Sequence, residues 1–405
     1  MKQRITHASN VGRLTALIGL LLLAPLLVLP FFPEDAPFAA VFLIPGIASI
    51  LVGLALCLCP PARPLTMQEA MHHGNLLVLS SAEGHPDKLM PTLRETVRTI
   101  VLMYMAFLAV GVGAYVLCGM PVFDAVLHTM GALSTGGFSN QAESIGAYHS
   151  VAIEGVTVVL MLVGTTNFAI LLLLVRRKWR DALRCSELRF LGALLVLFVP
   201  VTALVLMTGL YMSLGEGLRQ ALFNIVSALS TTGYATMSYE HWPQAALGIM
   251  ILMMLIGGGA GSTAGGIKLS RTFIMLKASF AELRARVSPE HEVRTPSITR
   301  AQGRTPVDAP TLRATAGFVS LYLLLFSAGT LLLCVTEGAP LASCMFEFAS
   351  SLGTVGLSIG LTGPATRAAT LLVEIAGMLL GRLEILLVFT GLGSAVFLMR
   401  QRRRR

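Results

Sequence analysis

Glycines that follow hydroxyl side chains recur three times along the 405-residue chain, in segments that align without gaps. The segments are AVLHTMGALSTGGFS (125–139), LFNIVSALSTTGYAT (222–236) and MFEFASSLGTVGLSI (345–359). A glycine can adopt backbone angles that turn successive carbonyl oxygens toward an axis, where they replace the water around a cation. The pattern predicts a cation site made of three consecutive residues from each segment: Ser134, Thr135 and Gly136; Thr231, Thr232 and Gly233; Thr354, Val355 and Gly356.

The element that must position each turn is a short helix. Each segment begins with an apolar stretch of about ten residues, which spans about 15 Å, half of a hydrocarbon layer about 30 Å thick. Such a segment has to enter the membrane and return, and non-helical backbone at that depth is tolerated only inside protein or along a water-filled path. Three re-entrant loops therefore indicate a pore. Close helix packing is the alternative role for these glycines, but it explains one turn more readily than three.

The direction of the short helices also favours a cation. They are expected to enter from outside, so their C-terminal ends, which carry partial negative charge, point toward the centre of the pore. Asp124 is expected to cap the outer start of the first short helix.

A fourth motif interrupts an apolar run that extends from about Ala245 to Leu276. It contains six glycines within ten residues, which predicts a break in the helix and a flexible intramembrane loop below the second turn. We expect this loop to be a gate, and its candidate residues are Gly257, Gly258, Gly259, Gly261, Gly265, Gly266 and Lys268. A kink used only for packing stays open as an alternative. A phosphate-binding loop does not fit, because Lys268 is misplaced relative to the glycines and no Ser or Thr follows it.

Charged residues lie within the last apolar run, at Glu374, Arg382 and Glu384. Charges inside a membrane are costly and normally face a bundle interior or a water path. Arg382 could pair with one of the two glutamates, or it could place positive charge below the turns and slow the passage of cations. The sequence leaves both readings open.

Composition excludes a soluble domain of this size, since 55% of the residues are hydrophobic, 13% are charged and the mean hydropathy is +0.76. About eight runs are long enough to span a membrane, and they begin near Leu14, Ala39, Thr99, Val151, Phe190, Ala245, Ala314 and Thr370. The first run is interpreted as an uncleaved span because no small-residue cleavage site follows it.

The net charge of +9 reflects the membrane topology, because Lys and Arg gather in every second connection between the apolar runs, above all in 176–189 and 268–313. This distribution places both termini in the cytoplasm and gives no reason to expect nucleic acid as a partner. The six cysteines lack the spacing of metal or redox sites, so we expect neither a disulfide nor a bound metal.

Five motifs together resemble the pore motifs of the Trk/Ktr/HKT potassium-transporter superfamily, nearest its TrkH-type membrane subunits. They are STGGFS (134–139), STTGYAT (230–236), GGGAGSTAGGIK (257–268), LGTVGLS (352–358) and GRLEI (381–385). The apolar runs, the three repeats and this resemblance together predict an all-α integral membrane fold with about eight transmembrane helices and three re-entrant pore loops. The resemblance also implies that Gly136, Gly233 and Gly356 bind K⁺ as selectivity-filter glycines, that 257–266 forms a gating loop, and that Arg382 is the family's positive residue in the last pore helix.

The resemblance further implies a non-enzymatic protein for potassium uptake across the bacterial inner membrane, with K⁺ as the transported ion and no covalently bound cofactor. Its expected assembly is a homodimer on a TrkA-like cytoplasmic nucleotide-binding regulatory subunit, which would dock on the basic loops 176–189 and 271–311. The basic tail 400–405 is expected to contact membrane lipid, with partner docking as an alternative.

One departure from the family pattern affects the expected domains. Members have four repeats around one pore, and the first repeat is missing from this sequence. The expected parts are an N-terminal helix pair (1–60), a cytoplasmic linker (61–98), a pore repeat (99–189), a second repeat with the glycine loop (190–311), and a last repeat with the tail (312–405). Two alternative functions follow: a non-conducting regulatory or assembly subunit, and a secondary transporter whose binding site is the broken helix at 257–266.

Overall fold

The computed structural model describes residues 15–17, 19–20, 22–23, 26, 39–57, 93–287, 296–363, 366–382 and 385. The chain forms two compact units, Met1–Val78 and Leu79–Arg405. In the first unit, the apolar helix α2 (Ala39–Cys57) packs at Gly46 against the segment around Gly19, because a Cβ atom on Gly19 would lie 2.7 Å from the Gly46 carbonyl oxygen. The expected linker up to residue 92, Glu384 and the basic tail lie outside the described residues.

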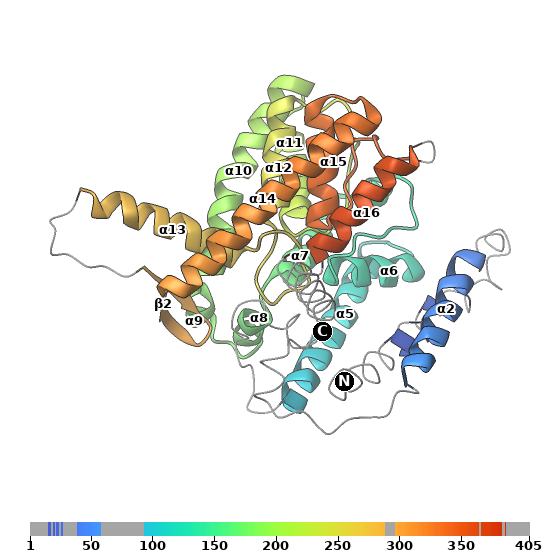
Figure 1. Ribbon diagram of the computed structural model, residues 1–405, viewed down its shortest axis with the longest axis horizontal. Coiled ribbons are helices and arrows are strands. Elements are labelled where there is room, and N and C mark those ends of the chain that lie inside the picture. Colours follow the sequence, from blue (N-terminus) through green and yellow to red (C-terminus); the bar gives the residue numbers. More distant parts are fainter. Residues whose placement is uncertain are drawn as a thin grey trace, which may run out of the picture. The chain divides into compact units, whose positions relative to one another are not determined.

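The second unit consists of three successive repeats, each with a first helix, a short helix and a second helix (Figure 1). The first repeat contains α5 (Leu93–Leu117), α6 (Val122–Leu133) and α7 (Val151–Thr165). The second contains α10 (Ser186–Leu210), α11 (Leu214–Leu229) and α12 (Gln244–Ile256). The third contains α14 (Ala309–Glu337), α15 (Leu341–Gly353) and α16 (Ala368–Arg382).

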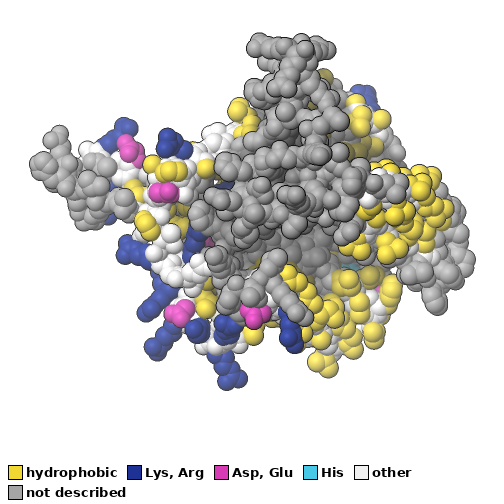
Figure 2. All heavy atoms as spheres, turned by 60° about the horizontal axis from the view of Figure 1, so that its bottom comes forward, with side chains coloured by type: hydrophobic (Ala, Val, Ile, Leu, Met, Phe, Trp, Pro, Cys, Tyr) yellow, Lys and Arg dark blue, Asp and Glu magenta, His cyan; other side chains and the backbone are white. Residues whose placement is uncertain are grey.

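The connections carry the remaining elements, which are η5 (Ser144–Tyr148), α8 (Phe168–Val175), α9 (Trp179–Arg184), α13 (Leu269–Ala285), β1 (Ser297–Arg300) and β2 (Gly303–Pro306). The two strands form an antiparallel hairpin, which is a small exception to the all-helical expectation. The hairpin is fixed to the second repeat, where the backbone N–H of Thr299 donates to the Ser186 hydroxyl over 2.9 Å. Figure 2 shows Lys and Arg side chains gathered on the side of the molecule where α9, the hairpin and α13 lie.

Three described helices are long and apolar enough to cross a membrane: α5, α10 and α14. A fourth span arises if α7 and α8 count as one, and these two helices bend by 115° at the break between them. The protein is therefore a multi-pass, mostly helical membrane protein, while the count of eight spans stays a prediction.

The short helices α6 and α15 begin directly after a proline, Pro121 and Pro340, and α11 begins after Ser213, whose hydroxyl accepts from the Glu216 N–H. The prediction that Asp124 caps α6 is wrong, because Pro121 occupies the N-cap and no side chain caps the helix. The Asp124 carboxylate instead accepts hydrogen bonds of 2.7 Å from Tyr148 and Asn140. Burial, followed by the neighbouring carboxylate, raises the pKa of the Tyr148 hydroxyl.

Successive repeats are joined by contacts between the second helix of one and the short helix of the next, namely α7 with α11 and α12 with α15. The first of these contacts contains an ion pair. Arg219 of α11 donates from Nε and from a terminal nitrogen to the two carboxylate oxygens of Glu154 on α7, both over 2.6 Å. The Glu154 side chain is 5% exposed and that of Arg219 is 34% exposed. Arg219 is the only Lys or Arg in 213–244. Its ion pair with Glu154 explains why a basic residue occurs in this segment.

Replacement of one partner in this pair is expected to destabilise the protein. Arg219→Met leaves the Glu154 carboxylate buried without its cation, which costs about 2 to 3 kcal/mol, less than in a fully buried pair because the guanidinium is partly exposed. Thermal unfolding in detergent should show a lowered midpoint, and the added change Glu154→Gln should restore part of it. Arg286→Met is the matched control, since its pair with Glu282 is exposed on both sides. An equal loss in Arg219→Met and Arg286→Met would contradict this assignment.

Candidate functional site

Each short helix ends in the same backbone turn. A threonine with a left-handed backbone stands at each helix end, and these residues are Thr135, Thr231 and Thr354, with φ values of 50°, 54° and 52°. Two residues later a glycine also has positive φ: Gly137 at 64°, Gly233 at 88° and Gly356 at 92°. The intervening residue donates its N–H to the carbonyl five residues earlier: Gly136 to Gly131, Thr232 to Ser227 and Val355 to Ser350. Each repeat therefore ends its short helix in a Schellman-type motif followed by a Thr-x-Gly turn.

A threonine at this position is unusual, because Schellman motifs normally place glycine in the left-handed conformation. A β-branched residue there costs about 1 to 2 kcal/mol of backbone strain. The same strained residue type occurs at three equivalent positions, so the turns are held in place by their surroundings. Such residues concentrate at functional sites, which makes the Thr-x-Gly turns the leading candidate site.

The backbone of the turns shows that the first segment is shifted by one residue relative to the gapless sequence alignment. The gapless alignment pairs Gly136 with Gly233 and Gly356, but the backbone places Gly137 at the equivalent position. The Thr-x-Gly spacing, which all three segments share, is the sequence signal that would have given this register. Ser134 is then the C-cap residue of α6, as Ser230 is of α11.

Adjacent turns touch through their backbones. A Cβ atom on Gly137 would lie 1.9 Å from the Thr232 carbonyl oxygen, and one on Gly233 would lie 2.0 Å from the Val355 carbonyl oxygen. The first turn thus packs on the second, and the second on the third. Only glycine permits this approach, because any other side chain would overlap the neighbouring carbonyl.

The series of turns is open at its two ends. No described atom lies within 4 Å of the position of a Cβ on Gly356, in the third turn. At the other end, the Phe138 side chain beside the first turn is 84% exposed. By contrast, the turn in the middle is enclosed, with Thr231 and Thr232 fully buried. Within the described residues, the third turn is therefore uncovered at Gly356, and the first turn is uncovered beside Phe138.

The glycine loop between α12 and α13 contacts the ends of all three short helices. The Gly265 N–H donates to the Thr231 hydroxyl oxygen over 2.6 Å. A Cβ atom on Gly265 would lie 2.2 Å from the Gly353 carbonyl oxygen at the end of α15. The Thr263 hydroxyl donates to the carbonyl of Leu133, the last residue of α6, over 3.1 Å. The predicted break in this apolar run is therefore present, and it lies against the turns.

The loop also occupies the break between α7 and α8. The Gly259 N–H donates to the Thr165 carbonyl oxygen over 2.9 Å, and the Phe168 N–H donates to the Gly261 carbonyl oxygen over 3.3 Å. Gly258 is buried so closely that a Cβ atom would lie 2.1 Å from the Thr165 hydroxyl oxygen. The expected loop is flexible, but in this structure it is closely packed. Much of it is buried, including Gly257, Gly258, Gly259, Gly265, Gly266 and Lys268, whereas Gly261 is exposed.

Two of the three charged residues that the sequence singles out in the last apolar run lie within the described residues, and their side chains have separate partners. A terminal nitrogen of Arg382 donates to the Thr263 carbonyl oxygen of the glycine loop over 3.1 Å. The Glu374 carboxylate accepts from the Thr362 hydroxyl over 2.7 Å, near the start of α16. Arg382 is thus fixed to the loop rather than to Glu374. Lys268 donates from Nζ to the Ala264 carbonyl oxygen within the same loop.

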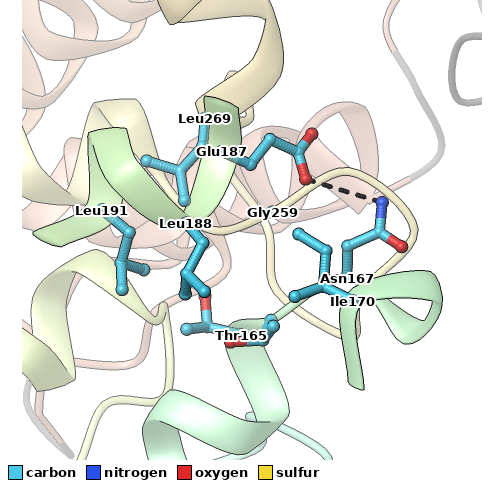
Figure 3. Close-up of a pocket in the computed structure, with 9 residues that line it drawn as sticks. Thr165, Asn167, Ile170, Glu187, Leu188, Leu191, Gly259 and Leu269 are labelled. Carbon is cyan, nitrogen blue, oxygen red and sulfur yellow. Dashed lines mark hydrogen bonds between the residues drawn. The ribbon is translucent and has the colours of Figure 1, made fainter. Parts of the chain in front are cut away.

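A small pocket adjoins the loop at the break between α7 and α8 (Figure 3). Its lining residues are Thr165, Thr166, Asn167, Ile170, Glu187, Leu188, Leu191, Gly259 and Leu269. The Asn167 side-chain N–H donates to the Glu187 carboxylate over 3.5 Å, a long hydrogen bond between two of the lining residues (Figure 3). The pocket is therefore part of the packing of the loop against α8 and α10.

The oxygen atoms of the turns are of the kind that suits a weakly held cation. They are backbone carbonyls and threonine hydroxyls, which are neutral donors of the kind that replace the hydration shell of an alkali ion. The Thr354 hydroxyl is buried and has no hydrogen-bond partner within the described residues. In the described part of the chain, no group of three or more His, Cys, Asp or Glu side chains is placed to hold a metal ion.

The fold and the turns define a class of membrane protein built from repeated units of helix, short helix, glycine turn and helix. The family described as "TrkH: Cation transport protein" matches residues 74–391, which is more than half of the chain. The chain therefore belongs to the TrkH family of cation transport proteins, a family of transporters rather than of enzymes.

Two relatives and one solved structure illustrate this membership. The chain is 30% identical over 316 residues to the Trk system potassium uptake protein TrkH of Salmonella typhimurium, an alignment that covers 75% of this chain and 63% of the relative. It is 32% identical over 319 residues to TrkG of Escherichia coli K12, with the same coverage. The crystal structure of the potassium transporter TrkH from Vibrio parahaemolyticus has the same fold, with a TM-score of 0.77 at 24% identity over 96% of this chain and 98% of that one. The chain thus spans less than two thirds of the length of the curated relatives.

The open end of the series predicts unequal effects of alanine at the three turn glycines. Gly356→Ala adds only the strain of a left-handed alanine, about 1 to 2 kcal/mol. Gly137→Ala and Gly233→Ala add the same strain and, in addition, an overlap with a backbone carbonyl that cannot rotate away. Thermal unfolding in detergent should therefore show the smallest loss for Gly356→Ala. Equal losses in all three variants would contradict the arrangement of the turns described above.

Proposed function

We propose that this chain is the pore-forming subunit of a potassium uptake system of the cytoplasmic membrane. The observation that carries this proposal is the set of three Thr-x-Gly turns whose backbones touch in series. The names of the relatives, Trk system potassium uptake proteins, support potassium as the ion. In the proposal, K⁺ exchanges its water for the carbonyl and hydroxyl oxygens of residues 135–137, 231–233 and 354–356. A membrane potential of about 100 mV, inside negative, would supply roughly 2.3 kcal/mol for each ion that enters.

The glycine loop is the proposed gate, and Arg382 the residue that fixes it. The loop lies against the turns, so its displacement would open the path below them. Arg382 donates a hydrogen bond to the Thr263 carbonyl, and the Thr263 hydroxyl donates to the Leu133 carbonyl at the end of α6. A positive charge at this position would also slow cations that leave the turns.

The proposed partners are inferred from the basic side of the molecule. Exposed Lys and Arg side chains gather near α9 and the hairpin (Figure 2), and in the proposal this side faces the cytoplasm together with both termini. It would receive a nucleotide-binding regulatory subunit of the TrkA type, with two copies of this chain in the assembly. Lipid would contact the basic tail 400–405.

A second candidate function is a non-conducting assembly subunit. The open ends at Gly356 and Phe138 favour it, because a path with three walls would not remove a cation's hydration shell evenly. Under the leading proposal, another polypeptide segment closes this side.

Growth and flux separate the two candidates. The full chain, expressed with and without a TrkA-type partner in a bacterium deficient in potassium uptake, should restore growth at limiting potassium. The purified protein in liposomes should take up rubidium, and potassium should compete. No rescue and no rubidium uptake under either condition would overturn the pore proposal and favour the assembly subunit.

Removal of the Arg382 side chain is expected to speed flux. Arg382→Ala releases the Thr263 carbonyl and removes a positive charge below the turns, so rubidium uptake should rise by about tenfold, which corresponds to the lower limit for one charge-assisted hydrogen bond. Arg382→Lys should stay near the wild-type rate, because the charge remains. Arg286→Ala serves as the control for loss of an exposed basic residue. Unchanged or slower uptake in Arg382→Ala would contradict the role of Arg382 as a brake.

A further inference from the structure

One position in each short helix carries a buried polar side chain that the turns do not explain. It lies seven residues before the strained threonine, and the three residues there are His128, Asn224 and Glu347. Their exposed fractions are 0%, 0% and 3%. A polar group buried among apolar helices is costly unless it is hydrogen-bonded. Because such a group recurs at one position in all three repeats, we expect each of the three side chains to have a hydrogen-bond partner, also at a corresponding position in each repeat.

Each of these side chains bonds a hydroxyl in the segment that leaves the turn. The His128 Nε2 atom lies 2.9 Å from the Ser139 hydroxyl. The Asn224 amide donates to the Thr236 hydroxyl over 3.0 Å, and the Ser358 hydroxyl donates to the Glu347 carboxylate over 2.5 Å. The partners are eleven, twelve and eleven residues apart in sequence, respectively. Three different side chains thus make the same connection across each turn.

The histidine makes this connection in a defined tautomer. Its Nδ1 atom lies 2.8 Å from the Asp124 carbonyl oxygen, which can only accept, so Nδ1 carries a hydrogen. In the neutral ring, Nε2 is then an acceptor, and the Ser139 hydroxyl donates to it. The same hydroxyl oxygen accepts from the Gln141 N–H over 3.0 Å, which extends the connection along the outgoing segment.

The other two side chains are satisfied by further bonds of the same kind. The Asn224 side-chain oxygen accepts from the Tyr239 hydroxyl over 2.6 Å. The Glu347 carboxylate also accepts from the Thr362 N–H over 3.1 Å, and the Thr362 hydroxyl continues to Glu374 on α16. The outgoing segment is therefore held at one or two points in each repeat.

We propose that His128, Asn224 and Glu347 are positioning residues that hold the outgoing side of each Thr-x-Gly turn, and so set the discrimination among alkali cations. The proposal rests on the cation path proposed above. A strained threonine relaxes if either side of its turn is released. The short helix and its terminal backbone bonds fix the incoming side, and these three connections fix the outgoing side. The distances between the oxygen atoms of each turn then depend on the length of the hydrogen-bonded connection between the short helix and the outgoing segment.

The test removes the tethered hydroxyl rather than the buried side chain, so that the fold survives. The variants are Thr236→Val, which keeps the shape, and Ser358→Ala. Ser238→Ala is the matched control for Thr236→Val, because Ser238 is an exposed residue of the same outgoing segment and its hydroxyl accepts from the backbone N–H of Glu240, two residues later. The wild-type protein and the three variants are purified as full chains in detergent and also placed in liposomes.

Hydrogen exchange is the first measurement. The Thr236 hydroxyl accepts from Asn224 and also donates to Gln220, so Thr236→Val removes two hydrogen bonds. Amide exchange of residues 233–239 should therefore become at least about fivefold faster in Thr236→Val and should stay unchanged in Ser238→Ala. In Ser358→Ala the same rise should appear in residues 356–361. Unchanged exchange in both variants would overturn the tethers. This measurement needs no transport, so it decides on the tethers even if the chain carries no ion.

Ion discrimination is the second measurement. The ratio of rubidium to sodium flux should fall by about fivefold in Thr236→Val and in Ser358→Ala, with the Ser238→Ala ratio at the wild-type value. Faster exchange with an unchanged ratio would show that the connections are structural only, and would overturn their role in selectivity. If the wild-type protein carries no rubidium, the cation path itself fails, while the exchange data still report on the tethers.

Discussion

Backbone hydrogen bonding at membrane depth is the constraint on which this structure depends. Peptide groups without regular secondary structure are costly there unless other protein groups bond them. The glycine loop meets this requirement by bonding to the places where helices end: the Thr165 carbonyl at the end of α7, the Thr231 hydroxyl after α11, and the Leu133 carbonyl at the end of α6. The helix ends and the loop thus supply hydrogen-bond partners to one another. Without these contacts, the polar groups on both sides would lack those partners.

Close approach of backbones is the second requirement, and it explains why glycine is used so often. Gly137 and Gly233 bring one turn against the carbonyl of the next, and Gly265 brings the loop against the end of α15. These contacts leave no room for a Cβ atom. Within the turns, three threonines have strained left-handed backbones, and they lie at the ends of the short helices, which the glycine loop contacts. Many close contacts therefore determine the backbone conformation of the site together.

The sequence predicts the repeats, the short helices and the break in the apolar run, because glycine spacing and apolar length are local properties of the chain. Its pairing of Gly136 with Gly233 is one residue out of register, since the gapless alignment follows helix composition, whereas the backbone follows the threonine at each helix end. The Asp124 cap is wrong for a similar reason: Pro121 already starts the helix, and the carboxylate reaches Tyr148 from a distant turn. The contact of Arg382 with Thr263 joins residues far apart in sequence, so it depends on how the elements pack and is not indicated by local spacing. The contact of His128 with Ser139 recurs at similar spacing in the other repeats, but with different side chains, so residue type does not indicate it.

The central claim is that a cation is held by the oxygens of the three Thr-x-Gly turns. Anomalous scattering from crystals of the full chain grown in rubidium tests it most directly, because rubidium follows potassium and its position can be located without ambiguity. The account predicts a rubidium peak within reach of the carbonyl oxygens of Gly136, Thr232 and Val355. A peak located only in the pocket beside Glu187, or no peak near the turns at saturating rubidium, would contradict it.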